Sequence, residues 1–187
     1  DGDMDKAVEW LRENGRYIMV DKDGDGEISD PADYDYIGSA QPKLTYGITN
    51  TFRYKNFDLS FFLRGTIGND ILNATRMAYA QSGFLPGTNA LDDPLTYTLS
   101  ETPRFSNYYL EKGSFMRLDN LTLGYKIKAL NGIRVYFTAQ NLFVITKYKG
   151  LDPEVPMDSG DGLTPGVEPR EFYPKARTFS VGLNLNF

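Results

Sequence analysis

Three aspartates stand on alternate positions in the segment DKDGDGEISD, residues 21–30. Calcium is a hard cation that takes oxygen ligands, and the EF-hand loop supplies them from spaced positions with a glycine at the sixth. With Asp21 as the first position, Asp23 and Asp25 fall on the third and fifth, and a glycine falls on the sixth. Glu27 would then offer its backbone carbonyl at the seventh position. The spacing therefore predicts a loop of the calcium-binding type.

The far end of this loop departs from the EF-hand pattern. The twelfth position is Ala32, whose side chain carries no oxygen. Either Asp33, one residue later, or Asp30 would have to close the site. The alternative interpretation is a solvated acidic turn whose carboxylates accept hydrogen bonds from their own backbone. In a calcium sensor two helices flank the loop, whereas a strand pattern follows here, so a structural role is expected rather than a signalling one.

Composition limits the other kinds of site. The 187 residues contain no histidine and no cysteine, which removes His-based triads, the usual zinc sites and disulfides. The net charge is −5 and the isoelectric point is near 4.8, which argues against a nucleic-acid partner. No spacing of carboxylates, lysines or tyrosines indicates an acid–base or nucleophilic pair. We therefore expect no enzyme and assign no catalytic residue.

Five segments in which apolar and polar residues alternate follow the acidic loop. Such a period of two is typical of strands with one apolar and one polar face. The aromatic content of 14% also favours β structure. Each segment has about ten residues or more, whereas strands in soluble domains usually have about 5 to 6 and bilayer-crossing strands need roughly 9 to 11. The segments are 44–54, 57–67, 115–127, 133–146 and 178–187.

The connections between these segments alternate between short and long. Short ones are expected at 55–56 and 128–132, and long ones at 68–114 and 147–177. A soluble sandwich would hide the apolar face against a second sheet, and alternation alone does not separate it from a barrel. Outer-membrane barrels have short periplasmic turns and long external loops. The loop asymmetry and the strand lengths together favour the barrel.

Two short helices are expected in the connecting regions. Residues 4–14 place Met4, Val8 and Leu11 on one helical face, and a second helix is possible at 70–82. Four aromatic residues also gather in the sequence before and at the start of the third strand, where they would either stack on sugar rings or pack a loop onto the barrel rim. They are Phe105, Tyr108, Tyr109 and Phe115.

Five blocks of sequence follow one another in a recognisable order. They read DKDGDGEISD, YIGSAQPKLTYGITNTFRYKNFDLSFFLRGTIGNDILN, GSFMRLDNLTLGYKI, RVYFTAQNLFVITKYKGLDPEV and TFSVGLNLNF. From about residue 17 to the end, this series resembles the C-terminal barrel part of SusC/RagA-type TonB-dependent transporters of the Bacteroidota outer membrane. The terminal Phe187 is similar to the signal that barrel-assembly machinery reads.

The resemblance implies an all-β fold: antiparallel strands forming the C-terminal part of a large transmembrane β-barrel, with long extracellular loops containing short helices. Residues 1–43 would be an extracellular segment, residues 44–187 would supply the last five strands, and the C-terminus would be periplasmic. Family barrels have roughly 22 strands and a plugged lumen. The chain would therefore be a fragment or one part of an assembly.

The same resemblance implies a function and a set of partners. The expected activity is uptake of an oligosaccharide or peptide after the TonB complex pulls on the plug, beneath a lid formed by a SusD-like surface lipoprotein. The expected partners are that lipoprotein, the TonB complex through the absent N-terminal part, the remaining barrel and plug, and membrane lipid. The rival hypothesis is a soluble, calcium-stapled extracellular β module that binds glycans.

Overall fold

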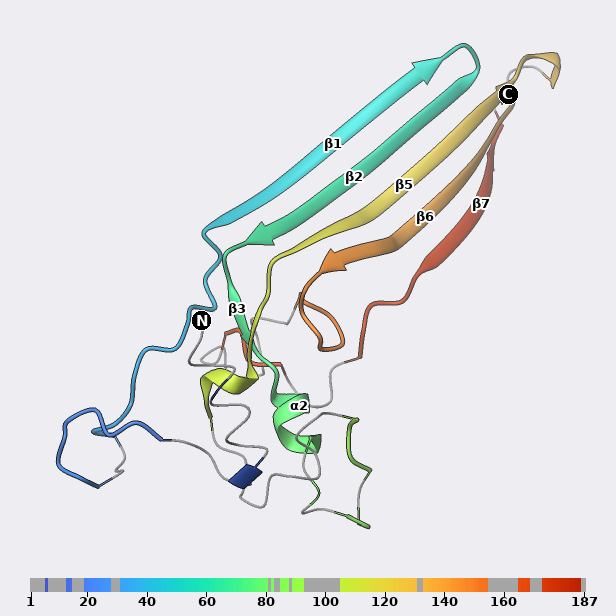
Figure 1. Cartoon of the computed structure of the whole chain (residues 1–187). Coiled ribbons are helices and arrows are strands. Elements are labelled where there is room, and N and C mark those ends of the chain that lie inside the picture. The colour runs from blue at the N-terminus through green and yellow to red at the C-terminus, as the bar shows by residue number, and fades with distance from the viewer. Residues whose placement is uncertain are drawn as a thin grey trace.

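A single antiparallel sheet of five long strands dominates the structure (Figure 1). The computed structural model describes residues 6, 13–14, 19–27, 31–80, 82, 85–87, 89–92, 105–130, 133–154, 165–168 and 173–185. The strand order in the sheet is β1-β2-β5-β6-β7. The strands are β1 (Leu44–Tyr54), β2 (Phe57–Ile67), β5 (Phe115–Ile127), β6 (Ile133–Thr146) and β7 (Thr178–Asn184).

The positions predicted for four of these strands are confirmed at both ends. The fifth begins where the period of two begins but stops at Asn184, and Phe187 lies outside the described residues. The tight turn at Lys55 and Asn56 is also present, with Lys55 in the left-handed region at a φ of 54°. Turn residues of this kind allow two antiparallel strands to follow each other directly.

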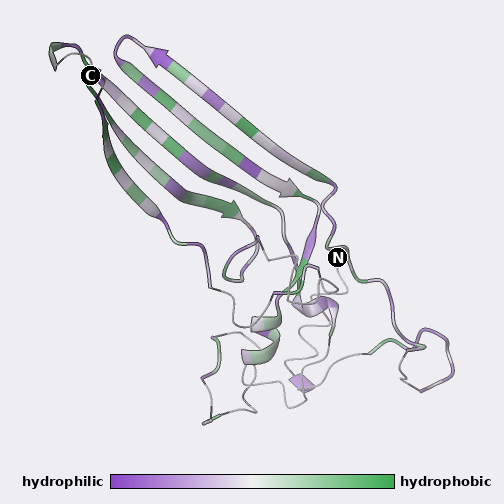
Figure 2. Cartoon of the chain, turned by 180° about the vertical axis from the view of Figure 1, so that it is seen from behind, coloured by the Kyte–Doolittle hydropathy of each residue, from purple (hydrophilic) through white to green (hydrophobic). Residues whose placement is uncertain are grey.

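The pairing register places the apolar faces of the strands on one side of the sheet. Ile48 lies opposite Leu63 across β1 and β2, and Leu59 lies opposite Leu123 across β2 and β5. Figure 2 shows hydrophobic and hydrophilic residues alternating along much of the sheet, with a continuous hydrophobic stretch at the end of β6. This face is open: Phe52 is 53% exposed and Val181 is 75% exposed. Within the described residues no second long-stranded sheet covers it, as the rival sandwich would require.

A smaller, loop-built body lies beyond one end of the long sheet. It contains a two-stranded sheet of β3 (Asp70–Leu72) and β4 (Leu110–Lys112), with the short helices α2 (Ala74–Tyr79) and η2 (Asn107–Tyr109). Its core includes Ile71 and Tyr109, which are at most 1% exposed. This body and the acidic loop lie at the end opposite the β1–β2 turn (Figure 1).

The helix expected at 70–82 is shorter than predicted, because its first residues form a strand instead. Asp70 to Leu72 pair with Leu110 to Lys112, so the helix begins only after Asn73. The Asn73 side chain caps it by accepting a hydrogen bond of 2.8 Å from the backbone N–H of Arg76. Of the helix expected at 4–14, residues 6, 13 and 14 are helical, and the others lie outside the described residues.

The two ends of the long sheet differ in their connections. At one end lie the β1–β2 turn and the short helix η3 (Lys128–Leu130), which leads from β5 towards β6. The C-terminal end of the chain reaches the same end of the sheet (Figure 1). We call this the short-turn end, and the opposite one the loop end. Across the described residues, no helix is both long enough and apolar enough to cross a bilayer.

Candidate functional site

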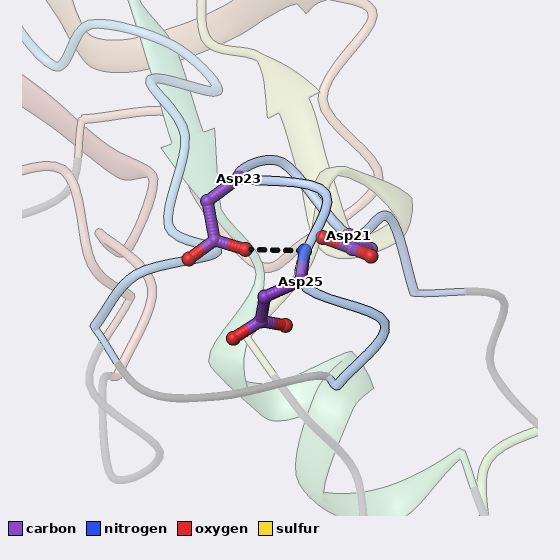
Figure 3. A group of neighbouring side chains, drawn as sticks. All are labelled: Asp21, Asp23 and Asp25. Atoms are coloured by element: carbon purple, nitrogen blue, oxygen red, sulfur yellow. Dashed lines mark hydrogen bonds between the residues drawn. The ribbon is translucent and has the colours of Figure 1, made fainter.

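The three aspartates of the acidic loop come together as their spacing predicts. The ligand oxygens of Asp21, Asp23 and Asp25 all lie within 4.8 Å of one another, and the side chains are exposed. Figure 3 shows the three carboxylates around one turn of the loop. Like charges this close repel one another, and a divalent cation among them would offset the repulsion. The donor set of carboxylate oxygens suits calcium or magnesium rather than a soft metal.

Hydrogen bonds to the loop's own backbone hold these aspartates in place. Asp21 accepts from the N–H groups of Gly24 at 2.6 Å and Gly26 at 2.9 Å. Both glycines have positive φ values, 78° and 86°, which most residues with a side chain adopt only with strain. Asp25 in turn accepts from the N–H of Glu27 at 2.8 Å. The backbone-capped acidic turn weighed in the sequence analysis is therefore present.

Asp33 reaches back to the start of the acidic loop. Its carboxylate accepts a hydrogen bond of 2.6 Å from the backbone N–H of Lys22, the neighbour of Asp21. It does not join the group of three within 4.8 Å, and the rival closing residue Asp30 lies outside the described residues. The Lys22 ammonium lies 2.7 Å from Asp35, and its hydrogen bond holds the pKa of that carboxyl below the usual value. Lys22 therefore holds residues 33–35 against the acidic loop through two contacts, one from its backbone N–H and one from its ammonium group.

A second charged cluster, which sequence reasoning missed, lies on the polar face of the long sheet near its loop end. It joins two arginines on strands to an aspartate of β5 and to acidic and basic residues of the loop between β6 and β7. Its members are Arg64, Arg117, Asp119, Asp152, Glu154 and Lys175. We call this set the wall cluster. In each ion pair of this cluster, the two residues are separated by at least 21 positions in the chain.

A β-bulge at Asp119 places the wall cluster on the polar face. Leu118 pairs with Leu63, and Asn120 pairs with Phe62, so Asp119 has no register partner on β2. The extra residue reverses the alternation along β5. Without it, Arg117 would share a face with Leu121; with it, Arg117 lies opposite Arg64 on the polar side. The bulge therefore keeps a cation off the apolar face.

Arg117 is the buried centre of the wall cluster. Its side chain is 1% exposed, and its Nη2 donates to Asp152 Oδ1 at 2.5 Å. Its Nη1 donates to the side-chain oxygen of Asn141, a residue with a φ of 50°. Asp152 is itself only 4% exposed. One guanidinium therefore ties strand β6 and the loop after it to strand β5 through charge-assisted bonds.

Glu154 links the same loop to two further cations. Arg64 Nη1 donates to Glu154 Oε1 at 2.5 Å, and the Lys175 ammonium donates to Oε2 at 2.5 Å. Burial by itself would raise the pKa of the Glu154 carboxyl, but the hydrogen bonds from Arg64 and Lys175 outweigh it and lower the pKa. The ionised form is therefore favoured in the folded protein.

Acid should weaken the attachment of this loop. Because the folded-state pKa of Glu154 lies below its ordinary value of 4.5, its stabilising contribution is complete above that value and disappears as the pH falls through the folded-state pKa. We expect amide exchange in residues 147–154 to accelerate below about pH 4.5, measured by hydrogen–deuterium exchange between pH 3 and 7 at matched chemical rates. Glu154→Gln should already show part of this acceleration at pH 7. An unchanged pH profile in this variant would contradict the assignment.

The loop end also contains a cavity and the aromatic residues noted in the sequence. The cavity is about 530 Å³ and is lined by Arg64, Glu154 and Lys175 together with Tyr46 and Phe115. Tyr109 is fully buried and Phe115 is nearly so, which favours loop packing over a sugar platform for these two.

The neighbouring aromatic residues differ in their surroundings. Tyr108 carries the Arg76 guanidinium 4.4 Å above its ring, and only Phe105, 75% exposed, is open to solvent. Nearby, burial raises the pKa of the Tyr148 hydroxyl, and the carboxylate of Glu168 adds to the effect.

Comparisons with known proteins agree in sequence and in fold. No protein-family model matches the chain. The chain is 38% identical to the TonB-dependent receptor SusC of Bacteroides thetaiotaomicron, over 94% of its own length and 18% of that protein. It is 36% identical to the TonB-dependent receptor P3 of Formosa agariphila, over 92% of its own length and 19% of that protein.

A solved structure gives the same result for the fold. The structure of the RagAB peptide importer in its closed-closed state matches 88% of this chain and 20% of the solved chain, with a TM-score of 0.65 and 26% identity. The chain therefore spans about a fifth of the length of the proteins that it matches.

Proposed function

This chain is a C-terminal barrel segment of a SusC/RagA-type TonB-dependent transporter, and we propose that it forms part of the wall of an outer-membrane nutrient importer. The observation that carries the proposal is the open apolar face of a single sheet whose strands have bilayer-crossing length. Hydrocarbon chains would cover that face. The polar face, with the wall cluster, would line the lumen.

The two ends of the sheet support one orientation in the membrane. Short turns lie on the periplasmic side and long loops outside in barrels of this type. The short-turn end, with the C-terminus, is therefore assigned to the periplasm, and residues 1–43 with the loop-built body to the exterior. There a SusD-like lipoprotein would form the lid, and the TonB complex would act through a plug supplied by the rest of the protein. The cargo would be an oligosaccharide or a peptide.

Uptake in a cell that carries the full transporter tests this function. Deleting its gene should abolish growth on the transported glycan or peptide, and a copy with an intact TonB-contacting segment should restore it. The chain has no cysteine, so single cysteines can report its orientation. A membrane-impermeant maleimide should label Val20→Cys on intact cells but Lys55→Cys only after the outer membrane is permeabilised. Recovery of the transporter in a soluble fraction would contradict the proposal.

We also propose that the acidic loop binds a structural calcium ion through the carboxylates of Asp21, Asp23 and Asp25, the backbone of Glu27 and, after a small adjustment, Asp33. The carboxylate cluster and the two positive-φ glycines support this proposal. Extracellular calcium sites have dissociation constants on the order of 0.1 to 1 mM. At a free calcium concentration about ten times the dissociation constant, the folded loop would gain about 1.4 kcal/mol.

Calcium removal tests the loop in the full transporter. Adding EGTA should make residues 19–35 more sensitive to protease, and adding back 5 mM calcium should restore resistance. The double variant Asp23→Asn/Asp25→Asn keeps similar side-chain shapes and should be sensitive in both conditions. The control Asp92→Asn removes an exposed carboxylate outside the loop and should behave as the unchanged protein. Equal protection with and without calcium in the unchanged protein would contradict the proposal.

A further inference from the structure

A shallow apolar groove runs over the outer face of the sheet near its short-turn end. Its volume is about 170 Å³, and it lies across β2, β5, β6 and β7. The side chains that form it are large and apolar: Phe57, Leu123, Tyr125, Val135, Phe137 and Val181. At one side the rings of Phe57 and Tyr125 stand 4.6 Å apart. A hydrocarbon chain in this groove would bury apolar surface on both sides, which is favourable.

Two exposed lysines, Lys55 and Lys128, lie at the short-turn end beyond this groove, although the chain as a whole carries a net charge of −5. The other charged residues of the described short-turn end, Arg53, Asp58, Lys126 and Arg134, lie on the polar face of the sheet, opposite the groove. Asp58 is already paired with Arg134 at 2.5 Å. Neither Lys55 nor Lys128 forms an ion pair within the described residues.

In the proposed membrane location, these two lysines stand at the level of the lipid headgroups. The Lys55 ammonium lies 5.2 Å from the centre of the Tyr54 ring, and Tyr54 belongs to the apolar row that Phe57 and Tyr125 continue. Lys128 follows Ile127, the last outward residue of β5, and is exposed. The backbone N–H of Lys126 donates to Asn56 at 2.8 Å, which joins the end of β5 to the β1–β2 turn. Lys55 therefore lies at the short-turn edge of the surface that contains the groove.

We propose that this surface binds an anionic glycerophospholipid, with an acyl chain in the groove and the phosphate near Lys55 and Lys128. The inference rests on the proposed membrane location of the sheet. Its charge complementarity points to a phosphate-bearing headgroup, because basic residues at a membrane surface attract anionic lipid. The occupant is a glycerophospholipid because the short-turn end faces the periplasmic leaflet in the proposed orientation.

Lipid retention by the full transporter tests the proposal. The transporter is purified in detergent, stripped of lipid and incubated with phosphatidylglycerol or phosphatidylcholine, and bound lipid is counted by native mass spectrometry. We expect phosphatidylglycerol to be retained in preference. Each basic residue near an anionic surface contributes roughly fivefold in binding, so Lys55→Gln/Lys128→Gln should weaken retention by roughly 25-fold at low salt. Lys43→Gln/Lys147→Gln, at the loop end, is the charge-matched control and should change little.

A groove-filling variant tests the apolar groove separately from the two lysines. Val181→Trp adds no charge and should lower phosphatidylglycerol retention by occupying the groove. Equal retention of the two lipids, equal loss in the control pair, or full retention in Val181→Trp would each overturn the proposal. Flotation with vesicles of 70% phosphatidylcholine and 30% phosphatidylglycerol is measured first. Failure of the unchanged transporter to float would contradict the membrane location itself, which is a different result from floating without lipid preference.

Discussion

Arg117→Ala should destabilise the loop end by about 3 to 5 kcal/mol, because it leaves the buried Asp152 carboxylate without its partner. In the folded protein the guanidinium is 1% exposed and donates to both Asp152 and Asn141. Water cannot replace those bonds without opening the loop, since Asp152 is also buried. The loss therefore includes the desolvation of an unpaired charge, which exceeds the net value of most hydrogen bonds.

The expected measurement is thermal or denaturant unfolding of the full transporter in detergent, together with protease sensitivity of residues 147–154. The stability of Arg117→Lys should lie between that of the unchanged protein and that of Arg117→Ala. An ammonium keeps the charge but lacks the planar fork that reaches two partners. Arg177→Ala removes an exposed arginine near β7 and should change stability by no more than about 0.5 kcal/mol. If Arg117→Ala were as mild as Arg177→Ala, the wall cluster would not hold the loop.

The removal of both partners gives a further check on this reasoning. Arg117→Met combined with Asp152→Asn leaves no unpaired buried charge, so the double variant should be more stable than Arg117→Met alone. The coupling measured in such a cycle isolates the pair from the rest of the network. A strictly additive result would show that the two side chains act independently.

The sequence was sufficient to predict the long strands because their information is local. In β1 and β2 the apolar residues recur at every second position, and the register brings like faces together, as with Phe52 opposite Leu59. A two-residue turn leaves little freedom in how such strands pair. The expected faces of β6 are confirmed in the same way, with Val135 opposite Tyr125.

The wall cluster was missed because its information is not local. Arg64 and Glu154 are 90 residues apart in the chain, and no spacing rule joins them. The bulge at Asp119 has no sequence signature of its own, and an unbroken alternation would have placed Arg117 towards lipid. The signal in the sequence was an arginine, Arg117, at a position where the alternation of β5 calls for an apolar residue. It indicates that the strand must contain a bulge or that the cation must find a buried partner.

The helix expected at 70–82 and the acidic loop show the same difference between local patterns, which the sequence reveals, and long-range contacts, which it does not. Helical spacing indicated the helix, but the pairing of Asp70 to Leu72 with a distant strand shortened it. In the acidic loop, alternate spacing predicted the meeting of Asp21, Asp23 and Asp25. The contact between Asp33 and the backbone of Lys22 depends on the path of the chain between them. Local patterns therefore predicted the elements, and long-range contacts set their limits.

An arginine placed on the apolar face in the middle of β5 should be costly, and on the polar face it should be tolerated. Leu121 stands at the centre of β5 between Phe61 and Ala139, and Thr122 stands between Ser60 and Thr138 on the other side of the sheet. At the bilayer midplane a lipid-facing arginine costs roughly 2 to 4 kcal/mol. Leu121→Arg should therefore reduce the amount of folded transporter in the outer membrane far more than Thr122→Arg.

Depth along the strand distinguishes lipid from a protein partner as the cover of this face. Ile127 lies on the same face as Leu121 but at the short-turn end, opposite Ile133. Near the interface the cost of a lipid-facing arginine falls to about 0 to 1 kcal/mol, because its side chain reaches the headgroups. In urea unfolding from phosphatidylcholine vesicles, the transporter with Leu121→Arg should therefore have a clearly lower free energy of unfolding than the transporter with Ile127→Arg. Equal costs at the two depths would point to a packed protein surface, since a dry protein interface has no such gradient along the strand.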